Sequence, residues 1–590
     1  MKRGLSIILS LVLALLCGAC QGGAREAAST APGLEQKRAS WQEKTEPVSF
    51  STNYFYASGG NGGKRAAWGE DAVSRAIMDL TGVRLVMPNG YQSLEQCRAS
   101  GDMPDLVYLA SAKEAEQMNN RDMSWAWDGL AEQYCPDFWA ELDGRELLAN
   151  RSEDGHVYTL KNGFCSDKVY QDDSIPLPLS YAMSLRTDIL SRLGADMPDS
   201  VEGLESLLYQ VRDRGDELGI SVPLKLGDAV KNPLPVWMGL HQDIYWEEES
   251  GTIRTPWCQE AWLDYFQRLR RWKEDGILVL PETVLPWNGE RFRYGADPGH
   301  PTAEAGFMLL SEYSALYRGA WFASGQCSTM HIGSLYAEGY HRLDGEDCFP
   351  YALIETPLTF EGTLQAQEAD MGWGKAGGAQ SQGGGTFITR VCHHPERAIL
   401  WMQFLHSDAG GRLTQWGLQQ QHYEMNEGIM RYQRDPVNPI YEIEDIVINP
   451  DVMVETGVTL WPFVYNGWVS QSVQASAAAE GTGDADRILR EQIIRAGIKR
   501  KMYTQRNPAL GQALPGYGSP TLKATYDRLE YQFLQAAQAM VSAPTEQALM
   551  EAWETLQAGL LQGGLEELEA AMTERYKNAL TDYQAAGYMQ

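Results

Sequence analysis

The N-terminal part of the chain alternates short apolar runs with an amphipathic segment, in the order expected of a strand–helix–strand unit. Residues 47–51 alternate apolar and polar side chains, which predicts a strand. Residues 71–80 place apolar side chains three to four positions apart, which predicts a helix. Two further short strands are predicted over residues 83–86 and 106–109. This order implies a parallel sheet with right-handed crossovers.

The same kind of pattern recurs later in the chain. Residues 178–185 are predicted to be extended and residues 186–193 to form a helix, and Ser200 is a good N-cap for the helix that follows. Residues 260–275 form a strongly amphipathic pattern, and residues 305–310 predict a short buried strand. A second region of alternating strands and helices is therefore expected.

The C-terminal third is predicted to be mostly helical. Residues 395–416 form one long helical pattern, which we expect to break at Gly410 and Gly411. Residues 519–588 repeat Leu, Ala and Met at steps of three and four. This tail is predicted to be a helical cap packed on one lobe.

The N-terminus has the pattern of a secretory signal. Lys2 and Arg3 precede an apolar run over residues 5–16, which is far shorter than the ~20 residues that a membrane-spanning helix needs. Cys20 follows Gly and Ala, so the segment resembles a bacterial lipoprotein signal that is cleaved before Cys20 and lipidated on its sulfur. Cys17 stands where that motif usually has Leu. An ordinary signal peptide cut at a nearby Ala is the alternative.

Composition narrows the class of protein further. The chain has 590 residues, which is too long for one core and favours two large lobes. A net charge of −29 argues against nucleic-acid binding, which needs basic surfaces. The 18 Trp and 28 Tyr would suit flat, half-apolar ligands such as sugar rings, although most aromatic side chains pack in cores. Residues 20–46 lack apolar periodicity and are expected to form a flexible linker.

Several motifs that would indicate other chemistry fail on inspection. The Gly-rich run at residues 58–64 lacks the spacing of a phosphate loop, and Arg65 stands where that motif has Ser or Thr. The cysteines after Cys20 are scattered and odd in number, so free thiols are expected, with Cys327 and Cys348 as the first pair to test. No histidine spacing indicates a metal site, so neither a metal nor a cofactor is predicted.

Several short segments together resemble the extracellular solute-binding lipoproteins of ABC importers, family 1, the sugar- and oligosaccharide-binding class. The matches keep the family's order over roughly residues 48–430, behind a lipoprotein-like signal. Each is short and degenerate, and the run SGDMPDLV at 100–107 is the most recognisable. The other segments are residues 68–83, 155–160, 185–190, 395–417 with the run SDAGGRLTQWG, and 421–423.

The resemblance implies an α/β, two-lobed periplasmic-binding-protein-like fold of type II, with a hinge between the lobes and a helical C-terminal segment. A signal peptide would occupy residues 1–19. The first lobe is expected at residues 47–180 plus about 355–445, and the second at 181–354 plus about 446–590. Some longer members carry a calcium loop, but residues 212–217 lack the alternating acidic ligands, so no calcium is expected there.

The family's function implies a protein without catalytic residues that closes on a ligand and hands it to ABC transporter permease subunits. It would act as a monomer outside the cytoplasm, held at the membrane by the lipid on Cys20. Sugar binding needs ring faces and short polar side chains near strand ends. The candidate ligand-binding residues on this basis are Trp68, Tyr91, Trp127, Asp128, Trp237, Asp243, Trp246, Ser311, Glu312 and Trp373.

Two other classes of function stay open. A secreted glycoside-active enzyme would need a pair of carboxylates, and 78 acidic residues always allow such a pair to be imagined. A ligand sensor or a peptide-binding lipoprotein could use the same fold. Turnover of an oligosaccharide would favour the enzyme, whereas saturable binding without a product would favour the binding protein.

Overall fold

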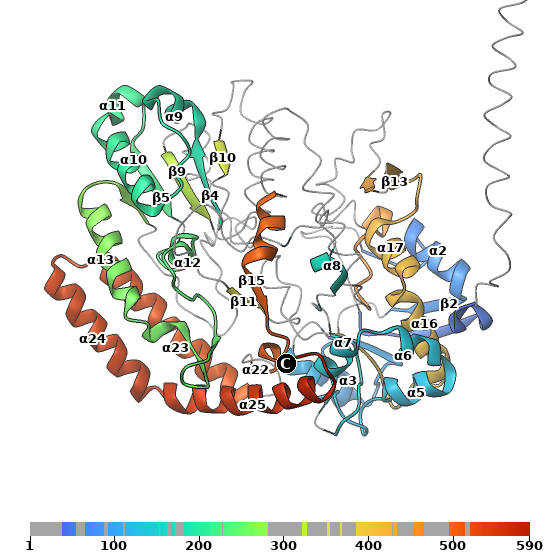
Figure 1. Ribbon diagram of the computed structural model, residues 1–590. Helices are drawn as coiled ribbons and strands as arrows, with labels where there is room; N and C mark the ends of the chain where they lie inside the picture. Colours follow the sequence, from blue (N-terminus) through green and yellow to red (C-terminus); the bar gives the residue numbers. More distant parts are fainter. Residues whose placement is uncertain are drawn as a thin grey trace, which may run out of the picture.

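Two separate hydrophobic cores divide the chain into two lobes. The computed structural model describes residues 38–589, except 55–64, 88–91, 110–111, 153, 162–163, 165–166, 172–176, 178–181, 227, 281–320, 327–350, 354–365, 369–384, 427–428, 433–453, 465, 467–494 and 514–519. The first core draws on residues between Phe50 and Leu160 and between Ile388 and Val464. The second draws on residues between Met183 and Ala323 and between Ala509 and Tyr583. Figure 1 shows the first lobe on the right and the second on the left.

The first lobe contains the predicted strand–helix–strand unit. Strand β1 (Val48–Ser51) pairs in parallel with β2 (Val83–Val86), and α2 (Ala72–Thr81) connects them. The helix begins where the Asp71 carboxylate accepts a hydrogen bond from the Ser74 N–H, and it ends at Gly82 in the left-handed conformation. Strand β3 (Leu106–Leu109) continues the parallel order through a bridge from Leu106 to Thr52 and pairs antiparallel with β12 (Gly385–Ile388).

Helices surround this small sheet. Helix α16 (Pro395–His406) is the central one, because nine of its twelve side chains are buried. The predicted break in the 395–416 segment is displaced: the helix ends at Ser407, whose hydroxyl caps α17 (Asp408–Trp416), and Gly410 and Gly411 lie inside α17. The other elements of this lobe are α3 (Leu94–Ser100), α4 (Ala112–Glu116), α5 (Trp127–Tyr134), α6 (Pro136–Glu141), α7 (Gly144–Asn150), β13 (Tyr423–Asn426) and β14 (Ile429–Tyr432).

The second lobe is built on a five-stranded mixed sheet. Its strand order is β10 (Tyr351–Leu353), β4 (Ala182–Arg186), β9 (Trp321–Gln326), β5 (Val222–Leu226) and β8 (Leu278–Val279). Helix α13 (Ala261–Glu274) buries its predicted apolar face in the core of this lobe. The other elements are α9 (Thr187–Leu193), α10 (Val201–Asp213), α11 (Gly215–Leu218), α12 (Leu234–Trp237), β6 (Tyr245–Glu247), β7 (Thr252–Arg254) and the 3-10 turn η2 (Pro256–Cys258).

Three C-terminal helices form the predicted helical cap. Helix α23 (Pro520–Val541) packs on α13, where the Phe533 ring lies 5.2 Å from the ring of Trp262. Helices α24 (Glu546–Gln562) and α25 (Leu565–Ala585) follow α23. The short helix α22 (Leu510–Ala513) comes before α23. Figure 1 shows α25 running beneath the molecule from the second lobe toward α7. Among the described residues, no helix combines the length and apolar character required to cross a membrane.

The N-terminal linker is shorter than predicted. Residues 40–43 form a 3-10 turn, η1 (Ser40–Glu43), that docks on the first lobe. Both the backbone N–H and the hydroxyl of Ser40 donate to Asp137, and the Trp41 ring lies 4.8 Å from the ring of Phe404. We expected residues 20–46 to form a flexible linker, and this is wrong for residues 40–43. The Trp41 ring and the hydrogen bonds from Ser40 to Asp137 hold them against the first lobe.

The C-terminal part of the chain is also divided differently from the predicted boundary near residue 446. Residues Val458, Leu460, Trp461, Phe463 and Val464 pack in the core of the first lobe. Only the segment from Ala509 onward joins the core of the second. The chain thus passes from the first lobe to the second between residues 464 and 509.

Candidate ligand-binding cleft

Three connections between the lobes leave the first lobe at one edge of its sheet. The register pairs Leu109, the last residue of β3, with Gly385, the first of β12. A Cβ built on Gly385 would overlap Thr159 Oγ1, so the end of the first connection and the start of β12 are neighbours. The Thr386 hydroxyl donates to the Phe463 carbonyl, which brings the third connection to the same place. This edge therefore faces the second lobe.

The second sheet turns its strand ends toward the first lobe. Strand β4, which follows the first connection, begins opposite the end of β9, because Ala182 pairs with Gln326. Strand β5 is parallel to β9 and ends beside it, with Leu226 paired to Gly325. Strand β10 ends at Leu353 and leads into the second connection. In α/β sheets, ligands bind outside the carboxyl ends of the strands, and here the carboxyl ends of both lobes lie toward the connections.

Aromatic side chains occupy the first-lobe side of this region. Asn53 extends the sheet, because its side-chain amide donates to the Tyr108 carbonyl and its oxygen accepts from the Tyr108 N–H. The Tyr54 ring lies 5.7 Å from the Tyr108 ring and 5.2 Å from the Phe463 ring. Tyr108 is half-buried, so part of its surface is open. Sequence reasoning did not select Tyr54 or Tyr108: Tyr54 lies three residues after β1, which was an available signal, whereas Tyr108 lies inside β3.

On the second-lobe side, a polar loop directly follows β5. One carboxylate oxygen of Asp228 accepts hydrogen bonds from the N–H groups of Val230 and Lys231, each at 2.6 Å. Asn232 donates to the Asp228 carbonyl and to the Tyr265 hydroxyl. Burial raises the pKa of Tyr265, so its hydroxyl stays protonated at neutral pH. These bonds hold the loop rigidly at the carboxyl end of β5.

The connections also contact one another, and we refer to this contact region as the hinge. The Leu177 N–H donates to the Gly497 carbonyl at 3.1 Å, and β11 (Ala366–Glu368) pairs in parallel with β15 (Thr504–Arg506). The Asp167 carboxylate, in α8 (Asp167–Gln171), forms ion pairs with Arg145 and Arg506. Burial opposes ionisation of Asp167, but the bonds from these two guanidinium groups lower its pKa.

Trp246 lies beside this hinge. Its backbone N–H donates to the side-chain oxygen of Gln367 in β11, and the Gln367 amide donates back to the Trp246 carbonyl. The Trp246 ring stacks on Tyr576 of α25. Asn507, directly after β15, donates to the Tyr576 hydroxyl at 3.1 Å. Among the predicted residues that the structure describes, Trp246 is thus in direct contact with a connection.

Other predicted ligand-binding residues lie in the cores. Trp127 and Trp237 expose no more than 2% of their surface. Trp68 is half-buried, donates from its indole nitrogen to the Val83 carbonyl and packs edge-on against Trp461, 4.9 Å between ring centroids. In this conformation none of the three offers a full ring face to a ligand, because neighbouring side chains cover it. The placement does not favour a stacking role for Trp127 and Trp237.

The two predicted carboxylates that the structure describes, Asp128 and Asp243, lie in different lobes. Asp128 accepts from the backbone N–H of Val157 and lies 2.7 Å from His156 Nδ1, so it fastens two segments of the first lobe. Asp243 is exposed in the loop before β6. Tyr91, Ser311, Glu312 and Trp373 lie outside the described residues, as do Cys20 and the Cys327–Cys348 pair.

Lys161, near the cleft edge of the first lobe, has an amine with altered basicity. Burial lowers the pKa of Lys161 to about 8, with Arg575 adding repulsion and Glu116 opposing it. Within the described ranges, no group of three or more His, Cys, Asp and Glu side chains is arranged to hold a metal ion. A separate groove of about 680 Å³ lies between β7 and α25, where Arg254 pairs with Glu569.

Comparisons with known proteins identify the fold. No family model matches the sequence, and no curated protein matches it. Among solved structures, an extracellular solute-binding protein from Bifidobacterium longum subsp. infantis aligns with a TM-score of 0.58 at 10% identity, over 90% of this chain and 98% of that one.

Two further structures align over the full length of their chains. The S. pneumoniae ABC-transporter substrate-binding protein FusA in complex with kestose has a TM-score of 0.56 at 12% identity and covers 91% of this chain. The alginate-binding protein AlgQ2 has a TM-score of 0.51 at 16% identity and covers 92%. The chain therefore has the two-lobed α/β fold of solute-binding proteins, as predicted.

Proposed function

We propose that this chain is the extracytoplasmic substrate-binding lipoprotein of an ABC importer, and that it captures a carbohydrate, specifically an oligosaccharide, by closing its lobes. The observation that carries the proposal is the arrangement of the two sheets, whose carboxyl strand ends both lie toward the three connections. Solved proteins of the same fold include the alginate-binding protein AlgQ2 and the substrate-binding protein FusA in complex with kestose. The abundance of Trp and Tyr in this chain is consistent with such ligands.

The location follows from the N-terminus. A basic start, a short apolar run and a cysteine after Gly-Ala support export, cleavage before Cys20 and lipidation of its sulfur. The docked η1 turn leaves about 19 residues between Cys20 and the first lobe, which can span at most about 60–70 Å. The protein would act as a tethered monomer that passes its ligand to the permease subunits of the transporter.

The binding step needs no covalent chemistry. A ligand that contacts both lobes favours the closed form by its difference in affinity for the closed and open forms. On the first lobe, the half-buried Tyr108, which packs on the buried Tyr54, is the aromatic side chain that such a ligand would meet. On the second lobe, the loop after β5 lies at the same edge, and Trp246 and Asp243 lie beyond it in the chain. Tyr91, Ser311, Glu312 and Trp373 complete the proposed set.

A thermal-shift screen of the purified protein against a glycan panel tests the proposal. We expect at least one oligosaccharide to raise the melting temperature in a saturable way, because a ligand that binds only the folded state stabilises it. Tyr108→Ala and Trp373→Ala should weaken that stabilisation, whereas Tyr531→Ala on α23 should not. No response to any glycan, together with a response to a peptide panel, would overturn the sugar assignment. Chromatography that finds a cleaved glycan would support the enzyme instead.

A further inference from the structure

The end of the C-terminal helix touches the first lobe, although the helix belongs to the core of the second. Leu568, Met572 and Tyr576 of α25 are buried in the second-lobe core. About two turns after Tyr576, the Tyr583 hydroxyl donates to the Arg145 carbonyl in α7 at 3.4 Å. Helix α25 therefore connects the lobes in addition to the three chain connections, as its course in Figure 1 also shows.

The residues after α25 make a second contact with α7. Gly587 has a φ of +79°, and this left-handed turn lets the Tyr588 N–H donate back to the Tyr583 carbonyl at 2.9 Å. The turn places the Tyr588 ring against the first residue of α7, Gly144. A Cβ built on Gly144 would overlap the Tyr588 hydroxyl, so alanine at that position would push the exposed Tyr588 ring away from α7.

Helix α7 is itself held by the first lobe. The Glu146 carboxylate lies 3.4 Å from His406 Nε2 at the end of α16. The side chain of Asn150 accepts from the Lys161 N–H at 2.7 Å. Leu147 packs on the first core and Leu148 on the second. A force applied to α7 by Tyr588 therefore reaches the body of the first lobe.

We propose that residues 583–588 act as a strap that fastens α25 to α7 and sets the resting angle between the lobes. A 21-residue helix is a rod of about 31 Å, so rotation of the second lobe must displace the far end of α25. Besides the Gln512–Ala149 hydrogen bond between α22 and α7, the strap supplies the Tyr583–Arg145 hydrogen bond and the contact of the Tyr588 ring, which is 43% exposed, so closure can break it. The strap would regulate closure of the lobes on a ligand, and this regulatory role rests on the proposed function.

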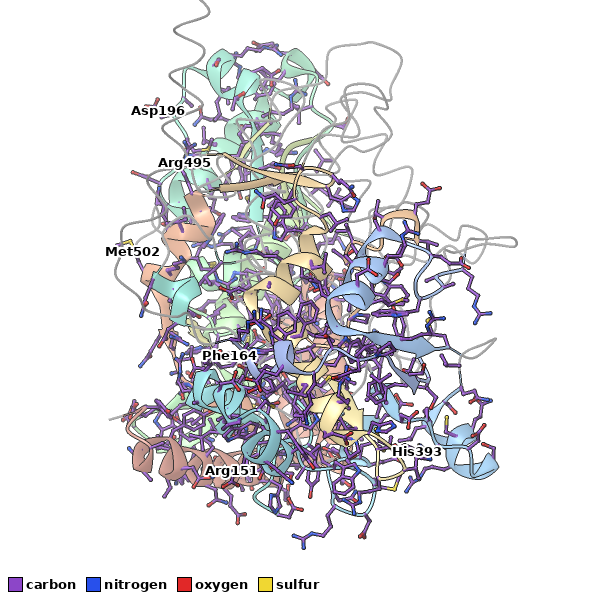
Figure 2. All side chains as sticks on the ribbon, turned by 90° about the vertical axis from the view of Figure 1, so that its right-hand side faces the viewer. Arg151, Phe164, Asp196, His393, Arg495 and Met502 are labelled. Carbon is purple, nitrogen blue, oxygen red and sulfur yellow. The ribbon has the colours of Figure 1, made fainter. Side chains whose placement is uncertain are left out.

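Distance measurements between spin labels in the ligand-free protein test the strap without any ligand. Labels at Asp196 in the second lobe and His393 in the first, both exposed and far apart in Figure 2, would be introduced through a non-canonical amino acid that spares the native cysteines. We expect deletion of residues 587–590 and Gly144→Ala to broaden the distance distribution and shift its mean. Gly129→Ala is the matched control, because a Cβ at Gly129 of α5 meets nothing within 4 Å.

The melting temperature of each variant shows whether a broader distance distribution reflects a loosened hinge or a loss of folding. The strap predicts unchanged melting temperatures for Gly144→Ala, with a distribution broader than that of Gly129→Ala. Should the deletion fail to fold, Tyr588→Ala removes the same contact and leaves Gly587 and the helix end in place. Distributions of Gly144→Ala and Tyr588→Ala that both match the wild type would overturn the strap. They would leave the proposed sugar binding intact, since the glycan screen tests that separately.

Discussion

Trp246 stacks on Tyr576 with 4.5 Å between ring centroids and 25° between ring planes. The two rings come from the hairpin of the second lobe and from the C-terminal helix, and the backbone of Trp246 also binds Gln367 in the second connection. Through its backbone and its ring, this one residue therefore joins the hinge to the helix that carries the strap. The same contact covers one face of the indole, so any ligand would meet only the other face.

Replacing Trp246 with alanine should lower the stability of the second lobe. The stacked pair contributes about 0.5–1.5 kcal/mol beyond its buried area, so we expect the free energy of unfolding in urea to fall by at least that amount. Trp246→Phe keeps an aromatic face on Tyr576 and should retain most of the stability. A loss of glycan binding in Trp246→Ala without a change in the urea midpoint would instead show that the ring acts on the ligand.

The docking of η1 should make stability depend on Asp137 at acid pH. Burial opposes ionisation of Asp137, but hydrogen bonds from Ser40 and Gln403 lower its pKa. The stabilisation is therefore present above the unfolded pKa of about 4 and is lost as pH falls through the folded value. Asp137→Asn should be less stable at pH 6 and should lose less stability on acidification than the wild type.

Urea unfolding at pH 6 and pH 3 measures this difference. Asp79→Asn, an exposed carboxylate on α2, provides the control and should follow the wild type. Limited proteolysis provides a second readout, because an undocked η1 would expose the peptide bonds around Trp41. Equal acid sensitivity in Asp137→Asn and the wild type would contradict the argument.

Local patterns predicted most elements because helix and strand periodicity depend on neighbouring residues. The apolar face of α13, with Trp262, Phe266, Leu269 and Trp272, was visible in the sequence and is buried as expected. The break between α16 and α17 was misplaced, since glycine propensity pointed to Gly410 while the Ser407 cap decides the boundary. Close packing also favours glycine at position 410, because a Cβ there would overlap the Phe404 carbonyl.

Long-range placement could not be predicted from the same signals. Residues 458–464 pack in the first core, yet nothing in their apolar character distinguishes one core from the other. Trp127 and Trp237 are of a residue type that can stack on sugar rings, but they fill the cores of the two lobes. An indole side chain suits either place, so the residue type alone does not tell them apart. Tyr108 was overlooked because its position at the cleft edge depends on the pairing of β3 with β12.

Loss of the Asp167 carboxylate should loosen the hinge. Asp167 in the first connection is paired with Arg145 of α7 and with Arg506 of the third connection. Asp167→Ala should therefore increase amide hydrogen exchange in residues 167–171 and 504–506, because β15 loses a partner that holds it to α8. Asp216→Ala, exposed on α11, is the control and should leave exchange there unchanged. Unaltered exchange in Asp167→Ala would mean that the β11–β15 pairing alone holds the hinge.

The depressed basicity of Lys161 predicts a rise in stability at alkaline pH. Its folded pKa of about 8 lies below the unfolded value of about 10.4. Between these values the unfolded chain binds the proton and the folded chain does not, so the stability rises with pH, by at most about 1.4 kcal/mol per unit. Below about pH 8 Lys161 is protonated in both the folded and the unfolded chain, and burial of its charged amine then lowers the free energy of unfolding.

Lys161→Met should remove this rise while keeping the length of the side chain. We expect the variant to be more stable than the wild type at pH 7 and to show a flatter stability profile from pH 8 to pH 10 in urea titrations. Lys273→Met, at an exposed position of α13, should keep the wild-type slope. A variant less stable than the wild type at pH 7 would show that the charged amine stabilises the edge of the cleft through Glu116, with attraction to that carboxylate exceeding the cost of burial.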